Sequence, residues 1–563
     1  MLGRALVTLA YLAPCFCKVY EDVAQLPGLS YDFIVAGGGT AGLVVANRLT
    51  ENSKFKVLVL EAGVSNVGVL DSEIPFLVGN LFGPTIYEWN YTTTPQSGLN
   101  GRVLSYPRAH MLGGCSSHNG MVYSRGSADD FNRYADLTGE PGWSWDQILL
   151  YFFKNEKISA PADHHNIQGQ FNPSVHSTKG VTSVSLPGFD WPIFYHKVLQ
   201  TTKELPEEFP FNLDTNSGKP LGLGWRQSTI GDGTRSSSAT SYLASEFTQR
   251  ENLHVLVHAQ VSQLVDPSNV AGKVVFGGVR FSQGASQFTA KATKEIILSA
   301  GTVGTPNILM HSGIGDQTIL KPLGIPTVLD LPSVGKGVQD HPFFSAVWSV
   351  NFTQTLESIT QNTTRFDEAF AEWNKSHTGP FAMLGPTHIA WLRLDPNSSI
   401  FENFTDPSAG QDTPHIELSF SPGVGLAPLT GPGNFLSIGV VASDFDLFTL
   451  REALKSAQRF FKAPVWQDAI IGPTQNLENI TTDALDAFIR NAVTPSSHLV
   501  GSAVMSARDA EDGVVIPDLL IKGARALRII DASVFPIIPS AHTQAATYAV
   551  AERAADLIKQ RWM

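Results

Sequence analysis

Two histidines near the C-terminus, His498 in SSHLVGSA and His542 in SAHTQ, are the residues best suited to proton transfer. An unperturbed imidazole has a pKa of about 6.5, so a neutral histidine can accept the proton of a hydroxyl group at working pH. The two are not at metal-ligand spacing from each other. Because the chain has 15 histidines, most of which are expected on the surface or hydrogen-bonded in the core, this pair indicates catalysis only if a reacting group lies beside it.

A glycine motif near the N-terminus predicts where that reacting group is held. Gly37, Gly39 and Gly42 form G-x-G-x-x-G between a strand and a helix. The first glycine allows a tight turn, the second lets a pyrophosphate approach the backbone, and the third permits close helix–strand packing. Glu61 ends the next strand, where its carboxylate can accept hydrogen bonds from a ribose. The motif predicts a dinucleotide site but does not distinguish FAD from NAD.

The elements around the motif form a βαβ unit between residues 31 and 63, with strands at 33–36 and 56–60 and a helix at about 40–49. A buried strand and an alanine-rich helix close the chain, whereas residues 346–440 are rich in Pro, Gly, Asn and Phe with weaker periodicity. We therefore expect two domains, each built from several chain segments.

Composition limits the partners. The chain has 563 residues, of which 43% are hydrophobic and 16% charged, as in a folded globular protein. Its formal net charge of −12 argues against nucleic acid or an anionic membrane as the main partner. Beyond the N-terminus, no apolar run is long enough for a membrane span. We expect a small-molecule substrate and a monomer.

The N-terminus indicates export. Arg4 followed by the apolar run 5–13 resembles a secretory signal spanning residues 1–17, although a buried N-terminal segment is an alternative. Removal of this segment would leave Cys115 as the one cysteine, without a disulfide or a metal-binding motif. Seven Asn-x-Ser/Thr sequons support a secreted glycoprotein; they begin at Asn90, Asn351, Asn362, Asn374, Asn397, Asn403 and Asn479.

Three further stretches identify a family resemblance. Residues 106–126, YPRAHMLGGCSSHNGMVYSRG, resemble the first signature of the glucose–methanol–choline (GMC) oxidoreductases, and residues 304–315, GTPNILMHSGIG, resemble the second. The C-terminal stretch from DASVFP onward resembles their flavin-closing segment. The resemblance implies FAD as the cofactor, no metal, and an α/β fold, α+β overall.

That fold would combine a Rossmann-like FAD-binding domain with a substrate-binding domain built on an antiparallel sheet. The FAD-binding domain would comprise residues 28–180, 220–345 and 500–563, and the substrate-binding domain residues 181–219 and 346–499. The resemblance, together with the glycine motif, places the following residues at the cofactor: Gly37, Gly39, Thr40, Ala41, Gly42, Glu61, Ala62, Arg108, Gly113, Gly114, Asn119, Gly120, Met121, Val122, Val261, Asp531, Ala532, His542, Thr543 and Gln544.

Within the family, the chain looks most like the aryl-alcohol oxidases. His498 aligns with the general base and His542 with its hydrogen-bonding partner, so His498 would take the alcohol proton while hydride passes to flavin N5. Primary benzylic or allylic alcohols would become aldehydes, and O2 would be reduced to H2O2. Tyr91 and Phe401 would contact an aromatic substrate, and Ser497 stands where these oxidases place a bulky aromatic.

Several alternatives remain open at this stage. The same histidine pair serves oxidases of sugars, choline-like or short-chain alcohols and quinone-dependent dehydrogenases, and a hydroxynitrile lyase branch keeps FAD without redox chemistry. Covalent attachment of FAD is also open, with His110 and His118 near the first signature. Around residues 436–446 the chain lacks a segment that relatives carry. Either part of the substrate-domain sheet is remodelled or missing, with exposed apolar neighbours and lower stability, or the gene model is incomplete.

Overall fold

The computed structural model describes residues 19–424, 431–442, 445–475, 477 and 480–563. The expected signal segment, residues 1–17, and the sequon at Asn479 lie outside the described residues. Among the helices that the model describes, none is both long and apolar enough to cross a membrane.

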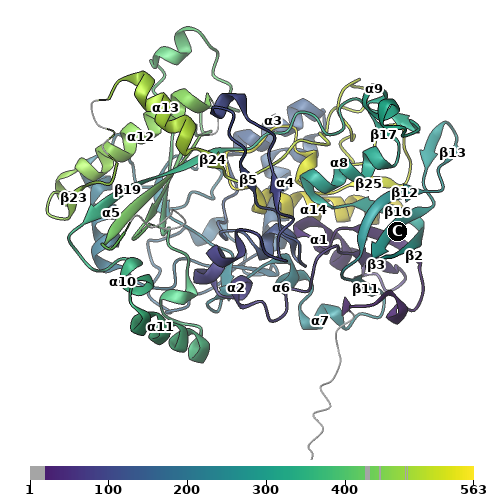
Figure 1. Cartoon of the computed structure of the whole chain (residues 1–563), viewed down its shortest axis with the longest axis horizontal. Helices are drawn as coiled ribbons and strands as arrows, with labels where there is room; N and C mark the ends of the chain where they lie inside the picture. The colour runs from purple at the N-terminus through teal and green to yellow at the C-terminus, as the bar shows by residue number, and fades with distance from the viewer. Residues whose placement is uncertain (1–18, 425–430, 443–444, 476, 478–479) are drawn as a thin grey trace, which may run out of the picture.

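An eight-stranded sheet forms the first half of the molecule, on the right in Figure 1. Its strands run in the order β1 (Val19–Tyr20), β11 (Leu253–Leu256), β3 (Val57–Leu60), β2 (Ser30–Ala36), β16 (Ser286–Leu298), β15 (Gly278–Gln283) and β12 (Gln260–Val265), and β25 (Leu527–Ile529) also pairs with β16. The central pairs are parallel, whereas β12 and β15 are antiparallel additions. The predicted βαβ unit, β2 to β3 through α1 (Thr40–Leu49), is confirmed.

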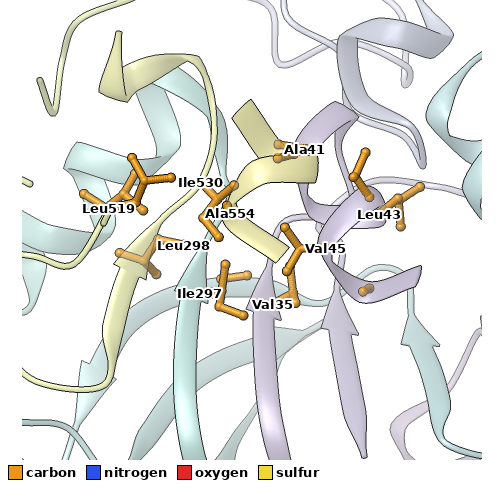
Figure 2. Packing of buried hydrophobic residues seen from close by; sticks show 14 of the residues in the cluster. Val35, Ala41, Leu43, Val45, Ile297, Leu298, Leu519, Ile530 and Ala554 are labelled. Atoms are coloured by element: carbon orange, nitrogen blue, oxygen red, sulfur yellow. The ribbon is translucent and has the colours of Figure 1, made fainter. Parts of the chain in front are cut away.

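Two helices, α1 and α14 (Thr543–Trp562), cover this sheet and pack against each other. In Figure 2, Val35 and Ile297 of the strands lie beneath Val45 of α1 and Ala554 of α14. All four side chains are buried, and the small alanines of α14 let the two helices approach closely. This packing fixes the glycine turn between β2 and α1 at the carboxyl end of the strands.

A second, antiparallel sheet forms the other half, on the left in Figure 1. It runs in the order β23 (Ile470–Pro473), β19 (Pro342–Val350), β22 (Phe435–Ala442), β21 (Ile416–Ser421), β20 (His388–Leu392) and β8 (Gly222–Trp225), with β24 (Thr494–Pro495) paired to β19. Helix α12 (Asp446–Lys462) packs on one face against the even-numbered side chains of the central strands, such as Leu418 and Ile438. The odd-numbered side chains, two residues apart along each strand, therefore point to the other face.

Two expectations about this sheet need correction. Strand β8 pairs with β20, although we had assigned residues 220–345 to the FAD-binding domain. The shortened chain around residues 436–446 leaves β22 hydrogen-bonded on both sides and buried along its whole length. The expected exposure of apolar neighbours is therefore not observed at β22.

A buried ionic cluster joins segments of the two halves. His176 places Nδ1 2.7 Å from Glu156 Oε1 and Nε2 2.7 Å from Asp214 Oδ2, and Arg125 also binds Glu156. Both ring nitrogens meet carboxylates, so the ring is an imidazolium. Burial alone would lower the pKa of His176, but the hydrogen bonds to Asp214 and Glu156 outweigh it and raise that pKa.

Candidate active site

One large cavity of about 1010 Å³ extends from the glycine turn of the first sheet to the odd-numbered face of the second. Most residues that we predicted at the cofactor line it: Gly37, Gly39, Thr40, Ala41, Glu61, Ala62, Arg108, Gly114, Asn119, Gly120, Met121, Val122, Val261, Asp531, Ala532, His542, Thr543 and Gln544. Gly42 and Gly113 do not line the cavity.

The glycine turn has the shape that a pyrophosphate needs. A Cβ at Gly42 would lie 2.1 Å from the carbonyl oxygen of Gly37, so only glycine allows this contact between α1 and β2. At Gly39 a Cβ would meet nothing within 3.7 Å and would project beside the N-terminus of α1, where an anion is favoured. Gly113 supports the turn by donating its backbone N–H to Gly38 O at 2.8 Å.

Glu61 is held at the same edge by two backbone amides. Gly38 N donates to Oε2 and Gly63 N to Oε1, each at 2.8 Å. Burial raises the pKa of Glu61 to about 7 against the opposing effect of these amide bonds. Its position at the end of β3 suits the recognition of a ribose.

The two catalytic candidates belong to a chain of four side chains. His498 Nε2 lies 3.0 Å from His542 Nδ1, and His542 Nε2 lies 3.0 Å from Glu417 Oε1. Behind His498, His341 Nδ1 lies 3.1 Å from His498 Nδ1. A carboxylate only accepts, so His542 carries its proton on Nε2 toward Glu417. Glu417 thereby fixes the orientation of His542 beside His498.

Burial sets the charge states of this chain. The pKa of His498 is lowered well below 6.5, first by burial and then by His542, His341 and Arg108. Burial also lowers the pKa of His341 to about 4. The pKa of Glu417 is lowered because the interactions with His542 outweigh its burial. His498 is therefore neutral at working pH and able to accept a proton.

The backbone at His498 is held from several directions. Ser497 has a left-handed conformation with φ of 63°, which is uncommon for a residue with a side chain. His498 N donates to Asp340 Oδ1 at 2.7 Å, Ser496 N donates to His341 O at 2.9 Å, and Arg108 donates to Ser497 O. These contacts stabilise the turn that directs the imidazole into the cavity.

Of the three residues that we predicted at the substrate, two line the cavity and one does not. Tyr91 and Ser497 line the cavity, and Tyr91 stacks on Trp89 with ring centroids 5.8 Å apart. Our prediction for Phe401 is wrong: it does not line the cavity but packs near Phe445 in the core of the second sheet. Phe401 lies in a 3-10 helix (Ser399–Glu402), and its apolar ring packs against that core.

The second sheet contributes a polar floor that the sequence analysis missed. We call the cavity-facing residues of its central strands the floor; they are Phe343, Ser345, Glu417, Ser419, Ser421, Ser437, Gly439 and Val441. The signal was present in IELSFS, residues 416–421, where polar side chains alternate with apolar ones. His341 was missed because its contact with His498 joins positions 157 apart in sequence.

Other reactive groups lie nearby. His118 lines the cavity, with Nε2 3.1 Å from Glu88 Oε1, whereas His110 packs against Trp89 outside it. The free thiol of Cys115 also lines the cavity. In the part of the chain that the structure describes, no group of three or more candidate ligands could hold a metal ion.

Comparison with known proteins identifies the family. The N-terminal GMC oxidoreductase model matches residues 31–343, and the C-terminal model matches residues 434–551. The chain belongs to the GMC oxidoreductase family. As in the rest of this family, its cofactor is FAD, and the open glycine turn, Glu61 and the helix N-termini fit such a dinucleotide.

Individual GMC relatives differ in their named substrates. A pyranose dehydrogenase of Agaricus campestris is 42% identical over 96% of both chains. A formate oxidase of Aspergillus oryzae superposes with a TM-score of 0.86 at 25% identity, covering 95% of this chain and 99% of the other. A fungal aryl-alcohol oxidase superposes with a TM-score of 0.80 at 24% identity, covering 95% and 100%, which shows a shared fold. The expected aryl-alcohol specificity is thus not established.

Proposed function

We propose that this GMC oxidoreductase oxidises a secondary or primary hydroxyl group of a pyranose sugar and passes the electrons to an organic acceptor such as a quinone. The observation that carries this proposal is the floor, where serines and Glu417 lie on the same cavity as His498 and His542. A polyol substrate can use the hydrogen-bonding capacity that these groups have left, whereas a purely apolar substrate would leave that capacity unused. The pyranose dehydrogenase relatives support the same substrate class.

Each residue of the histidine chain has a defined task in this reaction. FAD, when bound, accepts the hydride of the carbon that is oxidised. His498 removes the hydroxyl proton, and His542, held by Glu417, orients the reacting oxygen. General-base catalysis of this kind contributes roughly 10²–10⁴-fold to the rate. The carboxylate of Glu417 also disfavours anionic substrates, so we expect a neutral sugar.

A second candidate is the benzylic alcohol class that we first expected. Tyr91 stacked on Trp89 offers an aromatic surface in the cavity, and such surfaces bind either a flat ring or the C–H face of a sugar. Against the benzylic class, Phe401 does not reach the cavity, and Ser497 replaces the bulky aromatic of the aryl-alcohol oxidases.

Steady-state assays distinguish these candidates. D-glucose, 4-methoxybenzyl alcohol and methanol would each be tested with benzoquinone and with O2. We expect the highest kcat/KM for glucose with benzoquinone; a higher value for 4-methoxybenzyl alcohol would refute the sugar assignment. Anaerobic bleaching of the flavin by the preferred substrate would exclude a hydroxynitrile lyase, because that reaction leaves flavin oxidised.

A further inference from the structure

One row of the floor has the layout of a binding surface for hydroxyl groups. Ser345 of β19 and Ser419 of β21 both pair with Gly439 of β22, so the three residues form one row across three strands. Both serines are partly exposed to the cavity, and their Cα atoms lie about 10 Å apart because neighbouring strands are about 4.8 Å apart. A Cβ at Gly439 would lie 2.9 Å from the ring of Phe343, so that ring lies over this glycine.

The hydroxyl of Ser419 has a fixed direction. It donates to Glu417 Oε1 at 2.7 Å, and the reverse direction is excluded because a carboxylate has no proton to give. Ser419 therefore faces the cavity with lone pairs only. A substrate can bond to Ser419 through an O–H group that donates, but not through an ether oxygen.

Ser419 is also close to the chemistry. Glu417 Oε1 accepts from Ser419 and from His542 Nε2, so Ser419 Oγ lies no more than two hydrogen-bond lengths from the ring of His542. This separation corresponds to a hydroxyl one or two carbons from the reacting carbon of a sugar ring. The reacting oxygen and the hydroxyl bound by Ser419 would belong to the same ring.

We propose that Ser419 is a specificity-determining residue that accepts a hydrogen bond from a substrate hydroxyl neighbouring the one oxidised, and that Ser345 binds a more distant hydroxyl. This inference rests on the proposed function. It defines which sugars the enzyme selects: those with a donating hydroxyl at that position, and neither their deoxy nor their O-methyl derivatives.

The test is a matrix of enzyme variants and sugar derivatives. Purified holoenzyme would be assayed with D-glucose and its single deoxy and O-methyl derivatives, with benzoquinone as acceptor. The variants are Ser419→Ala, Ser419→Thr, which keeps the hydroxyl, and the control Thr327→Val. The hydroxyl of Thr327 is buried without a partner and lies away from the cavity, in the loop before β18 (Leu329–Asp330).

For the wild type, we expect one position at which both the deoxy and the O-methyl derivative lose kcat/KM by roughly tenfold, the value of a single hydrogen bond. In Ser419→Ala this penalty should disappear, while kcat/KM for glucose falls by about the same factor. Ser419→Thr and Thr327→Val should behave as the wild type does. If the effects of Ser419→Ala and of one sugar derivative on kcat/KM are not additive, Ser419 contacts that position of the sugar directly.

Two results would overturn the inference. A uniform loss in Ser419→Ala for every derivative would show that Ser419 acts only through Glu417. An unchanged pattern of penalties would show that Ser419 does not contact the sugar. If the wild type bleached with 4-methoxybenzyl alcohol but oxidised no sugar, the proposed function itself would be refuted, so the two failures are distinguishable.

Discussion

His341 lies behind the proposed base, and its removal is the most direct test of how that base is controlled. Its Nδ1 is 3.1 Å from His498 Nδ1, whereas its Nε2 is buried without a partner. In His341→Leu, His498 Nδ1 would be buried without a hydrogen bond. Leaving a buried polar group unpaired costs about 1–3 kcal/mol. If this cost adds to the activation free energy of hydride transfer, the rate of flavin reduction falls by roughly 5- to 150-fold.

The matched variant is His341→Asn, whose side-chain amide can occupy the place of Nδ1. We expect its hydride-transfer rate to stay within about fivefold of the wild type, because the hydrogen bond is kept. Both variants retain the backbone contacts of His341. The melting temperature of His341→Leu should change little, because removal of the unpartnered Nε2 offsets the loss of the hydrogen bond to His498 Nδ1.

The assay is anaerobic stopped-flow measurement of flavin absorbance after mixing with glucose. KM should change little in either variant, because the role of His341 is to position His498 rather than to bind substrate. A wild-type rate in His341→Leu, or an equal loss in both variants, would refute the reasoning.

Three further predictions follow from the site and the fold. Activity requires His498 to be neutral, and burial lowers the pKa of His498 well below 6.5. We therefore expect kcat/KM to stay level from pH 8 to 6.5. A loss of kcat/KM toward acid pH with a midpoint at 6.5 or higher would contradict this. The raised pKa of His176 means that its contribution to stability is complete below pH 6.5 and is lost as pH rises through the folded-state pKa. His176→Gln should remove this pH dependence of the melting temperature and cost about 3 kcal/mol at pH 6, because buried Asp214 loses its cation while Glu156 keeps only Arg125; an unchanged profile would argue against the imidazolium. Gly39→Ala should yield folded protein with little flavin by absorbance at 450 nm, whereas Gly42→Ala should lower the melting temperature, because only the second Cβ meets backbone atoms at 2.1 Å.

The sequence predicted the parts of the fold that depend on local pattern. The glycine turn, the buried strands β2 and β3 and the helix between them follow from spacing and apolar runs within about thirty residues. The histidine pair was also identified, because a family motif surrounds each member. The structure brings both histidines to the cavity that the glycine turn reaches.

The remaining site depends on contacts between distant segments. Glu417 is a charged residue inside a strand, and only its register beside β22 shows that it faces the cavity. Phe401 was misplaced because an aromatic side chain fits a core and a substrate pocket equally well by type. Strand β8 was assigned to the wrong half because its four residues carry no periodicity that indicates a partner.

The alternation along β19, β21 and β22 has a consequence for protein engineering. Each floor side chain is flanked in sequence by residues that hold the opposite face against α12, so the two faces can be altered separately. A combinatorial library at Ser345, Ser419, Ser421 and Ser437 would vary ligand preference while the scaffold beneath stays intact. The ligand-facing surface can therefore be changed by point substitutions, without insertions or deletions in the strands.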